Sequence, residues 1–454
     1  MAKTRWEGWA STSGPQTDNS AYLAFMNKHI LLFGAGKSAT CLIQFLDETV
    51  TSRDWLLTVA ENNLELAQSK LSGSPRAKAV QVSVEDREQR DNLIRAADII
   101  ISLLPPALHF LVATSCVEWK KHLLTASYLD EKLKALEPAV RDKGLLFLCE
   151  MGLDPGIDHM SAMQLIHRIT EQGGKIHSFH SHTGGLVSPV SDDNPWHYKI
   201  SWNPRNVVLA GSAGAKYLEN GQTVTRSYEE LFRQINKVEI NGLAPLAWYP
   251  NRDSLSYIPV YGLEGINTFI RTTLRYPDYI SAWSSIVKAG LTDDKKPLSK
   301  DDVTIAQWSS PIRPLVDDPI RPQLEYLGLF SDEPMPSSAH TSADVLQYLL
   351  ETRLAMRPGD RDMIVMLHEI AYTTAASSSS ATRKIASSLV VHGEDHRRTA
   401  MAKTVGLPLG IAAVLILDGK IRLTGLHIPI SPEIYTPVME ELALHDIRFV
   451  EEEH

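Results

Sequence analysis

The sequence predicts an α/β protein, in which a doubly wound parallel sheet is followed by an α+β domain with a mostly helical insert. The first observation is that short apolar segments alternate with helical patterns between residues 28 and 148. The second is that the later segments, at 99–104, 122–126 and 145–148, are almost continuously apolar, as parallel strands are when helices cover both faces. The third is a change after residue 150, where a loop dense in Gly, Pro and Asp precedes shorter alternating segments.

A glycine-rich turn follows the first predicted strand directly, because the apolar residues 30–33 lead into Gly34, Gly36 and Ala39. Gly34 allows a tight turn, Gly36 lets backbone N–H groups approach a pyrophosphate, and Ala39 keeps the next helix close. Glu61 ends the second predicted strand, where Rossmann units place an acid that hydrogen-bonds the ribose hydroxyls. The spacing therefore predicts a Rossmann domain that binds a nicotinamide cofactor, with NAD favoured and NADP left open.

The other elements follow from the same patterns. In the first domain we expect strands at 29–33, 56–60, 79–82, 99–104, 122–126 and 145–148, and helices at 37–48, 64–71 and 87–96. In the second we expect helices at 160–172, 279–290, 299–308 and 342–356, and strands at 175–182, 198–202, 361–374 and 384–391. Asn220 and Gly221 predict a hairpin turn, since this pair favours positive φ. The serine-rich residues 375–381 predict a flexible hairpin loop, and residues 399–417 a long buried helix.

These elements divide the chain into five segments. Residues 1–27 show neither a clean periodicity nor a signal-peptide pattern, so we expect a disordered leader or an extension. The cofactor domain is expected at 28–153, with residues 398–430 packing back on it. The substrate domain is expected at 154–397, including a helical insert at about 278–356, and residues 431–454 form a C-terminal tail segment.

Composition excludes several classes of function. The 454 residues carry a net charge of −9 and no run rich in Lys or Arg, so a nucleic-acid partner is not expected. The longest apolar runs, such as 405–417, are shorter than the 18 residues that we take as the minimum for a bilayer span, so no membrane segment is expected. Cys41, Cys116 and Cys149 lack a CxxC spacing, which is typical of reduced, cytoplasmic proteins.

Three histidines at 177, 180 and 182 suggest a metal site at first sight. On a strand, however, His180 and His182 share one face while His177 points to the other. No cysteine or acidic ligand in this stretch completes the set. We therefore expect no metal.

Several longer motifs resemble the saccharopine dehydrogenase family of the glutamate-forming type, also called saccharopine reductases. They run in family order from about residue 28 to 430, and the longest are Gly152-Leu-Asp-Pro-Gly-Ile-Asp-His159 and Tyr249-Pro-Asn-Arg-Asp-Ser254. Shorter ones are Ile101–Pro105, Thr125–Tyr128, Asp193–Pro195, Thr273–Tyr276 and Ala400–Lys403. The resemblance implies reversible conversion of saccharopine, NAD(P)⁺ and water to glutamate, aminoadipate semialdehyde and NAD(P)H.

The resemblance also implies the site residues. Those that would contact the substrate are Ser127, Tyr128, Asp154, Arg252, Thr273, Leu274 and Arg275. Those that would contact the cofactor, besides Gly34 and Ala39 of the turn, are Ala35, Gly36, Lys37, Ser38, Glu61, Asn62, Asn63, Ser83, Val84, Leu104, Ala126, Ser127, Leu153, Asp154, Pro155 and Asn203. NADP-using fungal members carry Cys-Arg-Thr at positions 61–63, whereas Glu61 would repel a 2′-phosphate, which again favours NAD.

Saccharopine carries three carboxylates, so arginines in the site have a clear chemical use. Guanidinium groups bind carboxylates bidentately, which suits Arg252 and Arg275, although arginines also commonly form surface ion pairs. Candidate catalytic residues are Asp154, Tyr128 and His159. Asp154 precedes Pro-Gly and could instead form a turn, and His159 at a helix start could be a packed or capping residue.

Two alternatives stay open at this stage. Carboxynorspermidine-type reductases also form C–N bonds by imine reduction, but a polyamine substrate needs acids where the paired arginine motifs here offer cations. A regulatory protein that binds NAD without catalysis would explain why no single side chain is evident as the catalytic base. Because members of the family often form dimers, a homodimer is also expected.

Overall fold

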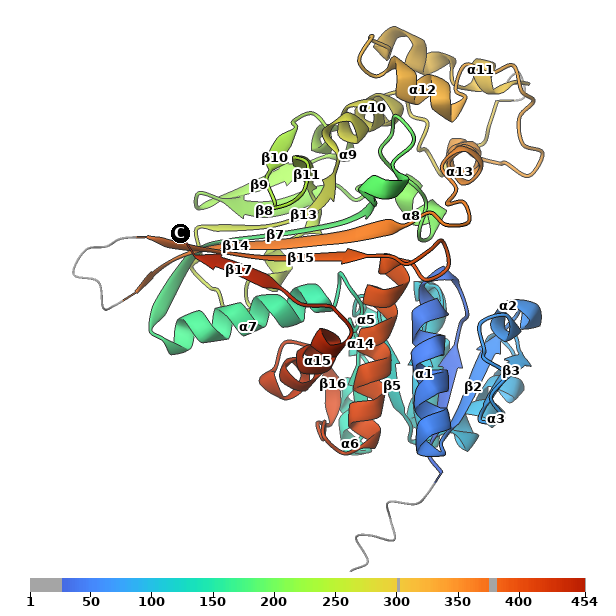
Figure 1. Ribbon diagram of the computed structural model, residues 1–454, viewed down its shortest axis with the longest axis vertical. Coiled ribbons are helices and arrows are strands. Elements are labelled where there is room, and N and C mark those ends of the chain that lie inside the picture. Colours follow the sequence, from blue (N-terminus) through green and yellow to red (C-terminus); the bar gives the residue numbers. More distant parts are fainter. Residues whose placement is uncertain (1–26, 300–302, 375–381, 454) are drawn as a thin grey trace, which may run out of the picture.

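The computed structural model describes residues 27–299, 303–374 and 382–453, which form two β-sheets with helices around them (Figure 1). The second sheet runs across the middle of Figure 1, and the first sheet stands below it, beside the helix that is coloured blue and labelled α1. The leader predicted for residues 1–27 lies outside the described residues except for Asn27, and the flexible loop predicted for 375–381 lies outside them entirely.

The first sheet has seven parallel strands in the order β16-β6-β5-β4-β1-β2-β3. Phe33 of β1 is aligned with Ala60 of β2 and with Ser102 of β4, so the loops after these strands open at one edge. The strand order reverses at β1, as in a doubly wound sheet, and the predicted Rossmann fold is confirmed. The strands are β1 (His29–Phe33), β2 (Leu56–Glu61), β3 (Ala77–Gln81), β4 (Ile99–Ser102), β5 (His122–Thr125), β6 (Leu146–Leu148) and β16 (Gly425–His427).

Helices cover both faces of this sheet. Ile30 and Leu32 of β1 share a core with Leu42 of α1, whereas Leu31 and Phe33 belong to the core on the opposite face. The predicted helix at 37–48 is a short 3₁₀ turn followed by an α-helix that extends to Arg53. The elements are η2 (Lys37–Ala39), α1 (Thr40–Arg53), α2 (Leu64–Gln68), α3 (Arg87–Ala96), α4 (Pro106–Trp119), α5 (Glu131–Lys134) and α6 (Glu137–Asp142).

The second sheet has ten strands, with β13, β7 and β14 at its centre. The helix α7 (Ile157–Glu171) lies against one face, where Ser161 Oγ is 2.8 Å from His368 Nε2. The predicted hairpin at Asn220 and Gly221 is confirmed, because it joins β8 and β9. The strands are β7 (Gly174–Val187), β8 (Ala215–Glu219), β9 (Gln222–Arg226), β10 (Asn236–Val238), β11 (Leu246–Pro250), β12 (Arg252–Asp253), β13 (Thr268–Arg275), β14 (Asp362–Thr374), β15 (Arg383–His392) and β17 (Val450–Glu453).

A mostly helical body follows β13 and lies at the top of Figure 1. Its apolar core includes Trp196, Tyr198 and Trp283, all nearly inaccessible to water. The main helices are α10 (Pro277–Lys288), α11 (Ile305–Trp308), η5 (Ser310–Leu315), α12 (Arg321–Leu327) and α13 (Ser342–Arg353). Shorter ones in the same domain are η3 (Pro189–Ser191), α8 (Pro204–Val208), α9 (Tyr228–Leu231) and η4 (Leu255–Tyr257).

Two predictions in this region are wrong. Residues 198–202 form no strand, because the ring of Tyr198 packs on Tyr279 and only Ile200 makes an isolated bridge. The helix predicted for 299–308 is limited, within its described part, to Ile305–Trp308, since the Thr304 capping box fixes its start there.

The C-terminal part returns to both sheets. The helix α14 (Ala400–Leu417) packs on α1, α15 (Pro432–Leu444) and β14, while β16 joins the first sheet and β17 the second. The prediction that no apolar run reaches 18 residues is wrong, because α14 has 18 residues and a mean hydropathy of 1.9. Among the described residues it is the one helix long and apolar enough to span a bilayer, and 72% of it is buried in the protein.

Candidate active site

The turn between β1 and α1 has the backbone geometry that its glycines predict. Gly34 has φ of 100°, and a Cβ atom there would lie 2.7 Å from the carbonyl oxygen of Leu103. A Cβ atom at Gly36 would meet nothing within 4 Å, so the space in front of this residue is open. A nicotinamide dinucleotide fits this arrangement, since its pyrophosphate needs a tight turn beside exposed backbone N–H groups.

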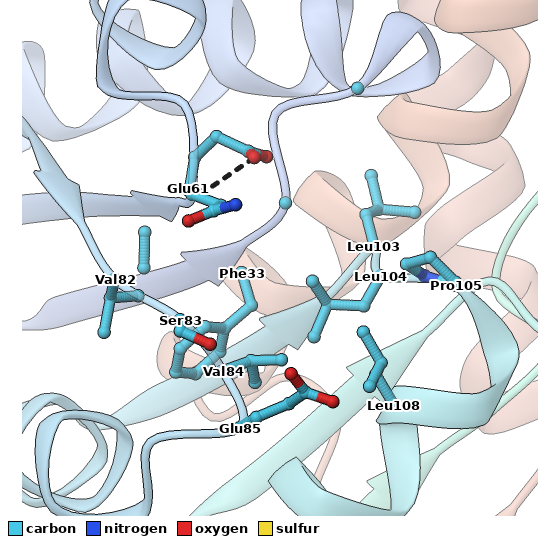
Figure 2. Close-up of a pocket in the computed structure, with 14 residues that line it drawn as sticks. Phe33, Glu61, Val82, Ser83, Val84, Glu85, Leu103, Leu104, Pro105 and Leu108 are labelled. Carbon is cyan, nitrogen blue, oxygen red and sulfur yellow. Dashed lines mark hydrogen bonds between the residues drawn. The ribbon is translucent and has the colours of Figure 1, made fainter. Parts of the chain in front are cut away.

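A cavity of about 360 Å³ lies beside this turn, with Glu61 on one side and the Leu103–Leu108 segment across from it (Figure 2). Seven of the predicted cofactor residues line it, namely Gly34, Gly36, Glu61, Asn62, Ser83, Val84 and Leu104. The other lining residues are Phe33, Ala60, Val82, Glu85, Leu103, Pro105 and Leu108. The cavity therefore joins the ends of β1, β2 and β4 at one edge of the sheet.

The remaining predicted cofactor residues do not line this cavity. Among them, Asn63 caps α2 and Asn203 caps α8 with its side chain, and Ala39 is buried under the turn. The others are Ala35, Lys37, Ser38, Ala126, Ser127, Leu153, Asp154 and Pro155. Of these, residues 126–127 and 153–155 follow β5 and β6, so they lie along the same edge of the sheet.

Glu61 lies at the end of β2, as predicted, and its carboxylate faces the glycine-rich turn. Its Oε2 accepts a hydrogen bond from the backbone N–H of Ala35 at 2.7 Å, and its Oε1 accepts one from that of Asn62 at 2.9 Å. No lysine or arginine lines the cavity among the described residues. The sign of the charge here suits ribose hydroxyls better than a phosphate.

A buried histidine connects the ends of β4 and β5. His109 Nδ1 is 2.8 Å from Ser102 Oγ, and its Nε2 is 2.7 Å from Ser127 Oγ. Burial lowers the pKa of His109 to about 4, so the ring is neutral near neutral pH. The imidazole thus holds the hydroxyl of Ser127 in place at the edge of the sheet.

The two domains meet at an ionic cluster around Arg271, a buried residue of β13. Its Nη2 donates to Asp154 Oδ1 at 2.7 Å and to Asp158 Oδ2 at 2.8 Å. Asp154 also accepts a hydrogen bond from the hydroxyl of Tyr128 at 2.9 Å, and the peptide bond between Asp154 and Pro155 is cis. Burial is the main cause that raises the pKa of Tyr128 well above its usual range, so this phenol keeps its proton.

His159 lies behind this cluster and is completely buried. Its Nε2 is 2.7 Å from Glu150 Oε2 and its Nδ1 is 2.5 Å from the hydroxyl of Tyr261. Glu150 in turn accepts a hydrogen bond from the backbone of Leu129, next to Tyr128. Both ring nitrogens of His159 are therefore engaged, which is the arrangement of a residue that positions its neighbours.

The structure separates the two predicted carboxylate-binding arginines. Arg252 is exposed, has φ of 50°, and stacks over the ring of Tyr128 at 5.3 Å. Arg275 is 4% exposed and lies between Tyr198 and Tyr279, at 5.2 and 5.4 Å from the ring centres. Its Nη1 donates to the carbonyl of Leu274, and its Nε has no partner in the described part of the chain. Neither guanidinium pairs with a carboxylate among the described residues.

The two residues before Arg275 differ in their exposure. Leu274 is fully buried in a core with Leu186. A Cβ atom added at Gly184 would lie 2.7 Å from the Cβ atom of Leu274. Thr273 is half-buried on the face of β13 that also carries Arg271 and Arg275. Of the predicted 273–275 contacts, Leu274 therefore offers its backbone alone.

An acidic side chain does accompany the histidines of β7, so the expectation that none completes the set is wrong. Glu369 of β14 lies beside His180 and His182, and one ligand atom from each of the three lies within 4.8 Å of the others. The partner was missed because it is 187 residues away from His182 in sequence.

Sequence reasoning missed five residues that support the site, namely His109, Glu150, Asp158, Arg271 and Tyr257. The ring of Tyr257 lies 4.5 Å from the guanidinium of Arg271, and its hydroxyl donates to Glu150 Oε2 at 3.4 Å. The arginine had a readable signal, because a charged residue within the buried strand 268–275 requires a partner. Asp158 lies inside the motif that carries the resemblance, but its spacing from Asp154 did not indicate that both carboxylates bind one arginine. The histidine at 109 lies in an apolar helix without a local pattern that marks it.

Comparison with known families agrees with this architecture. The family profile described as the saccharopine dehydrogenase NADP binding domain matches residues 30–148, and that of the saccharopine dehydrogenase C-terminal domain matches 152–447. The chain belongs to the saccharopine dehydrogenase family. The resemblance noted in the sequence is thereby confirmed, and a dinucleotide-binding domain covers the first part of the chain.

Relatives of two lengths are similar to this member of the family. The saccharopine dehydrogenase [NADP(+), L-glutamate-forming] of Saccharomyces cerevisiae is 34% identical over 92% of this chain and 97% of its own length. The mitochondrial α-aminoadipic semialdehyde synthase of Bos taurus is 34% identical over 93% of this chain but only 47% of its own. The chain thus spans about half the length of the bovine relative.

A solved structure shares the whole architecture. Apo saccharopine dehydrogenase (L-Glu forming) from Saccharomyces cerevisiae superposes with a TM-score of 0.83 at 33% sequence identity, covering 94% of this chain and 100% of the yeast chain. Both sheets and the helical body therefore belong to the saccharopine dehydrogenase fold.

Proposed function

We propose that this protein oxidises the secondary amine of saccharopine with NAD(P)⁺ and water to L-glutamate and aminoadipate semialdehyde, reversibly, in lysine metabolism. The proposal is supported by full-length similarity to the yeast enzyme, whose name states this activity. In this reaction a carbon beside the amine loses a hydride and the nitrogen loses a proton. Water then adds to the resulting imine, and its C–N bond breaks to give the amine of glutamate and the aldehyde.

The observation that carries the proposal is the pair of guanidinium groups that have no carboxylate partner among the described residues. Arg275 is buried, and a buried cation without an anion is costly unless a ligand supplies one. Arg252 lies over Tyr128 at the edge of the Arg271 cluster, in a backbone conformation that non-glycine residues rarely adopt. We assign both as receptors for carboxylates of saccharopine, which separates this substrate from a polyamine.

The bound nicotinamide supplies the hydride acceptor in this proposal. Ser127, held by His109, is placed to orient the ring or the reacting amine. Tyr128 retains its proton, so Asp154 is the member of the hydrogen-bonded pair that can accept one. His159 is buried behind the Arg271 cluster. It acts by fixing Glu150, which in turn holds the loop that carries Tyr128.

NAD(H) is the proposed cofactor, although the yeast relative is named for NADP⁺. Glu61 places a carboxylate beside the glycine-rich turn, and no cation lines the described part of the cavity. A 2′-phosphate beside this carboxylate would be repelled, whereas ribose hydroxyls can donate hydrogen bonds to it.

Initial rates with saccharopine and each dinucleotide in turn test the proposed activity. We expect saccharopine-dependent formation of reduced cofactor, and consumption of reduced cofactor with glutamate and the semialdehyde. Absence of both reactions with both cofactors would reject the proposal. A diamine with a semialdehyde is the matched control substrate, and turnover of this pair alone would favour a polyamine reductase. Dinucleotide binding that no amino dicarboxylate influences would favour a non-catalytic role.

Two further expectations belong to this proposal. A homodimer is expected from the family, and light scattering of the full chain measures it.

A cytoplasmic location is expected from the three free cysteines, of which Cys116 and Cys149 are buried. The bovine relative is named as mitochondrial, so localisation of the tagged full-length protein decides between the two compartments.

A further inference from the structure

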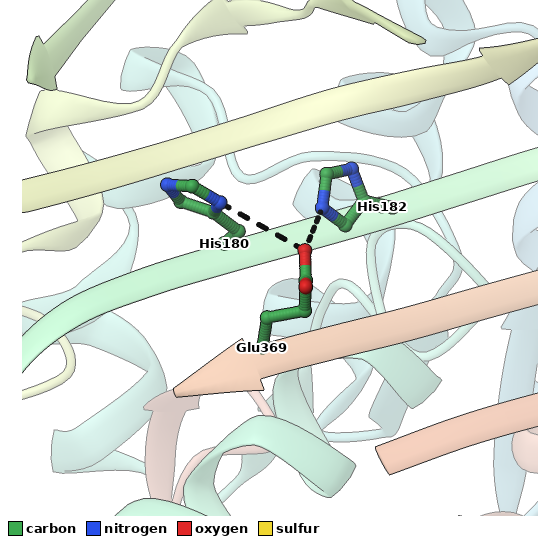
Figure 3. Close-up of side chains that lie close together, drawn as sticks. All are labelled: His180, His182 and Glu369. Carbon is green, nitrogen blue, oxygen red and sulfur yellow. Dashed lines mark hydrogen bonds and ion pairs between the residues drawn. The ribbon is translucent and has the colours of Figure 1, made fainter. Parts of the chain in front are cut away.

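Two histidines of β7 and one glutamate of β14 gather on one face of the second sheet (Figure 3). Glu369 Oε2 lies 3.0 Å from His182 Nε2 and 3.9 Å from His180 Nδ1. Figure 3 shows both rings directed toward this carboxylate. The three side chains therefore converge on a common point in front of the sheet.

The strand register places these residues together. His180 is directly opposite Glu369 in the antiparallel pairing of β7 with β14, and His182 is two residues further along the same strand. Residues i and i+2 share a face, and directly opposed residues have Cβ atoms about 4.5–5.5 Å apart. The cluster is thus set by three backbone positions in the centre of a sheet rather than by mobile loops.

This cluster lies on the opposite face of the sheet from the proposed active site. The neighbouring His368 points toward α7, where its Nε2 is 2.8 Å from Ser161 Oγ, so Glu369 points away from α7. On β13, Arg271 reaches Asp158 of α7, whereas the next residue, Thr272, faces His182. Any ligand of the cluster is therefore separated from Asp154 and Tyr128 by the sheet.

The geometry suits a tetrahedral metal ion. Zinc binds imidazole nitrogen and carboxylate oxygen at about 2.0–2.2 Å, which places two ligand atoms roughly 3.3–3.6 Å apart. The distances of 3.0 and 3.9 Å to Glu369 Oε2 bracket this range, and the ligand atoms of all three residues lie within 4.8 Å of one another, so binding requires the side chains to draw together around the ion. The side chain of Glu369 is 46% exposed, which leaves a coordination position open to water.

Polar groups around the cluster are arranged as supports for ligands. Thr272 Oγ1 is 2.7 Å from His182 Nδ1, so it fixes the ring and leaves Nε2 directed at the common point. The nitrogen of His180 that faces Glu369 is Nδ1, at 3.9 Å from its Oε2, so Nδ1 is the ligand atom that this ring offers. The other nitrogen, Nε2, is buried without a hydrogen-bond partner among the described residues and lies outside the coordination.

We propose that His180, His182 and Glu369 bind one divalent transition-metal ion of the zinc class, with water as the fourth ligand. The ion joins β7 to β14 across the middle of the sheet and replaces the hydrogen bond between His182 and Glu369. Because the folded chain alone brings the three ligands together, binding stabilises the folded state. The proposal does not depend on the substrate of the enzyme.

Calorimetric titration of the chelator-treated full chain with zinc chloride tests this site, with cobalt absorption as the report on geometry. We expect one ion per chain with a dissociation constant of about 10 µM or less, and a tetrahedral cobalt spectrum. Glu369→Gln should weaken binding about 100-fold, and Thr272→Val about 10–100-fold. His177→Gln is the control, since His177 bonds Thr373 outside the cluster, and it should bind zinc as the wild type does.

Thermal unfolding provides the second measurement. Saturating zinc should raise the melting temperature of the wild type and of His177→Gln, and leave that of Glu369→Gln unchanged. Wild-type protein that binds no zinc at about 100 µM would overturn the proposal. Equal zinc affinity in the wild type and in Glu369→Gln would overturn it as well, because the ion would then bind elsewhere.

Discussion

Asp154 and Arg271 form an ion pair of 2.7 Å that joins the two domains. Asp154 lies in the loop after β6 of the first sheet, and Arg271 is in the middle of β13 of the second. The same guanidinium binds Asp158 at the start of α7, so one cation fixes both the loop and the helix that follows it. This buried charge thus helps to fix the placement of Tyr128 and the contact between the two domains.

Removing this charge should destabilise the protein strongly. Arg271→Met leaves Asp154 and Asp158 without a counterion, and breaking a buried pair costs about 3–5 kcal/mol of the free energy of unfolding. Urea unfolding measures this loss. The matched control is Arg168→Met, which removes an exposed pair with Glu451 and should cost under about 1 kcal/mol. Equal losses for the two variants would contradict the role assigned to Arg271.

Arg275 should contribute to substrate binding rather than to cofactor binding. Arg275→Met removes a buried guanidinium that no carboxylate of the described protein neutralises. If it binds a carboxylate of saccharopine, kcat/KM should fall by a factor that corresponds to about 2–5 kcal/mol of lost transition-state stabilisation. Arg252→Met should act in the same direction but less, because its side chain is exposed. Steady-state kinetics with saccharopine, and fluorescence titration with the dinucleotide, separate the two effects. Unchanged saccharopine kinetics would remove Arg275 from the site.

Glu61 should set the preference for NAD. Glu61→Ser removes both the hydrogen-bond acceptor for ribose and the charge that repels a 2′-phosphate. We expect the ratio of kcat/KM for NAD to that for NADP to fall at least about tenfold, equivalent to 1.4 kcal/mol. The comparison uses saccharopine as the common substrate. Wild-type preference for NADP would refute the proposal, and Lys70, which donates to Gly36, would then be the cation to substitute.

His109 should make stability sensitive to acid. Its pKa is lowered from 6.5 to about 4 by burial, so the folded state favours the neutral ring. The neutral ring of His109 therefore makes its full contribution to the free energy of unfolding above pH 6.5. This contribution, about 3 kcal/mol, is lost as the pH falls from 6.5 toward 4. His109→Gln keeps a donor and an acceptor for Ser102 and Ser127 but does not titrate. Urea unfolding between pH 4 and 7 should therefore show a shallower loss for this variant, and parallel curves would contradict the assignment.

Local chemistry explains which parts of the molecule could be predicted. The strand that ends at Phe33, the turn at Gly34 and the acid at Glu61 depend on neighbours within about 30 residues. The hairpin at Asn220 is equally local. Each of these features was therefore readable from spacing and backbone preference, and each lies where it was expected.

The contacts that were missed join distant parts of the chain. Arg271 meets Asp154 across 117 residues, and His182 meets Glu369 across 187. Which residues of two strands are opposed depends on register, and a shift by one residue would move every side chain to the other face. Periodicity gives the face of a residue but not its partner, so the ionic cluster and the candidate metal site required the tertiary structure.

The packing of α14 against α1 provides the last prediction. A Cβ atom at Gly406 would lie 3.0 Å from the backbone nitrogen of Leu42, whereas one at Gly410 would meet the ring of Phe45 at 2.6 Å. A side chain can move aside but a buried backbone cannot. Gly406→Ala should therefore cost about 1–3 kcal/mol by overpacking. Gly410→Ala should cost less, because the atoms displaced are the side-chain ends of Phe45 and Leu42, and the higher helix propensity of alanine, about 1 kcal/mol, offsets part of the displacement. Urea unfolding of the two variants compares one methyl group in two surroundings, and equal effects would contradict the distinction drawn between the Leu42 backbone and the Phe45 ring.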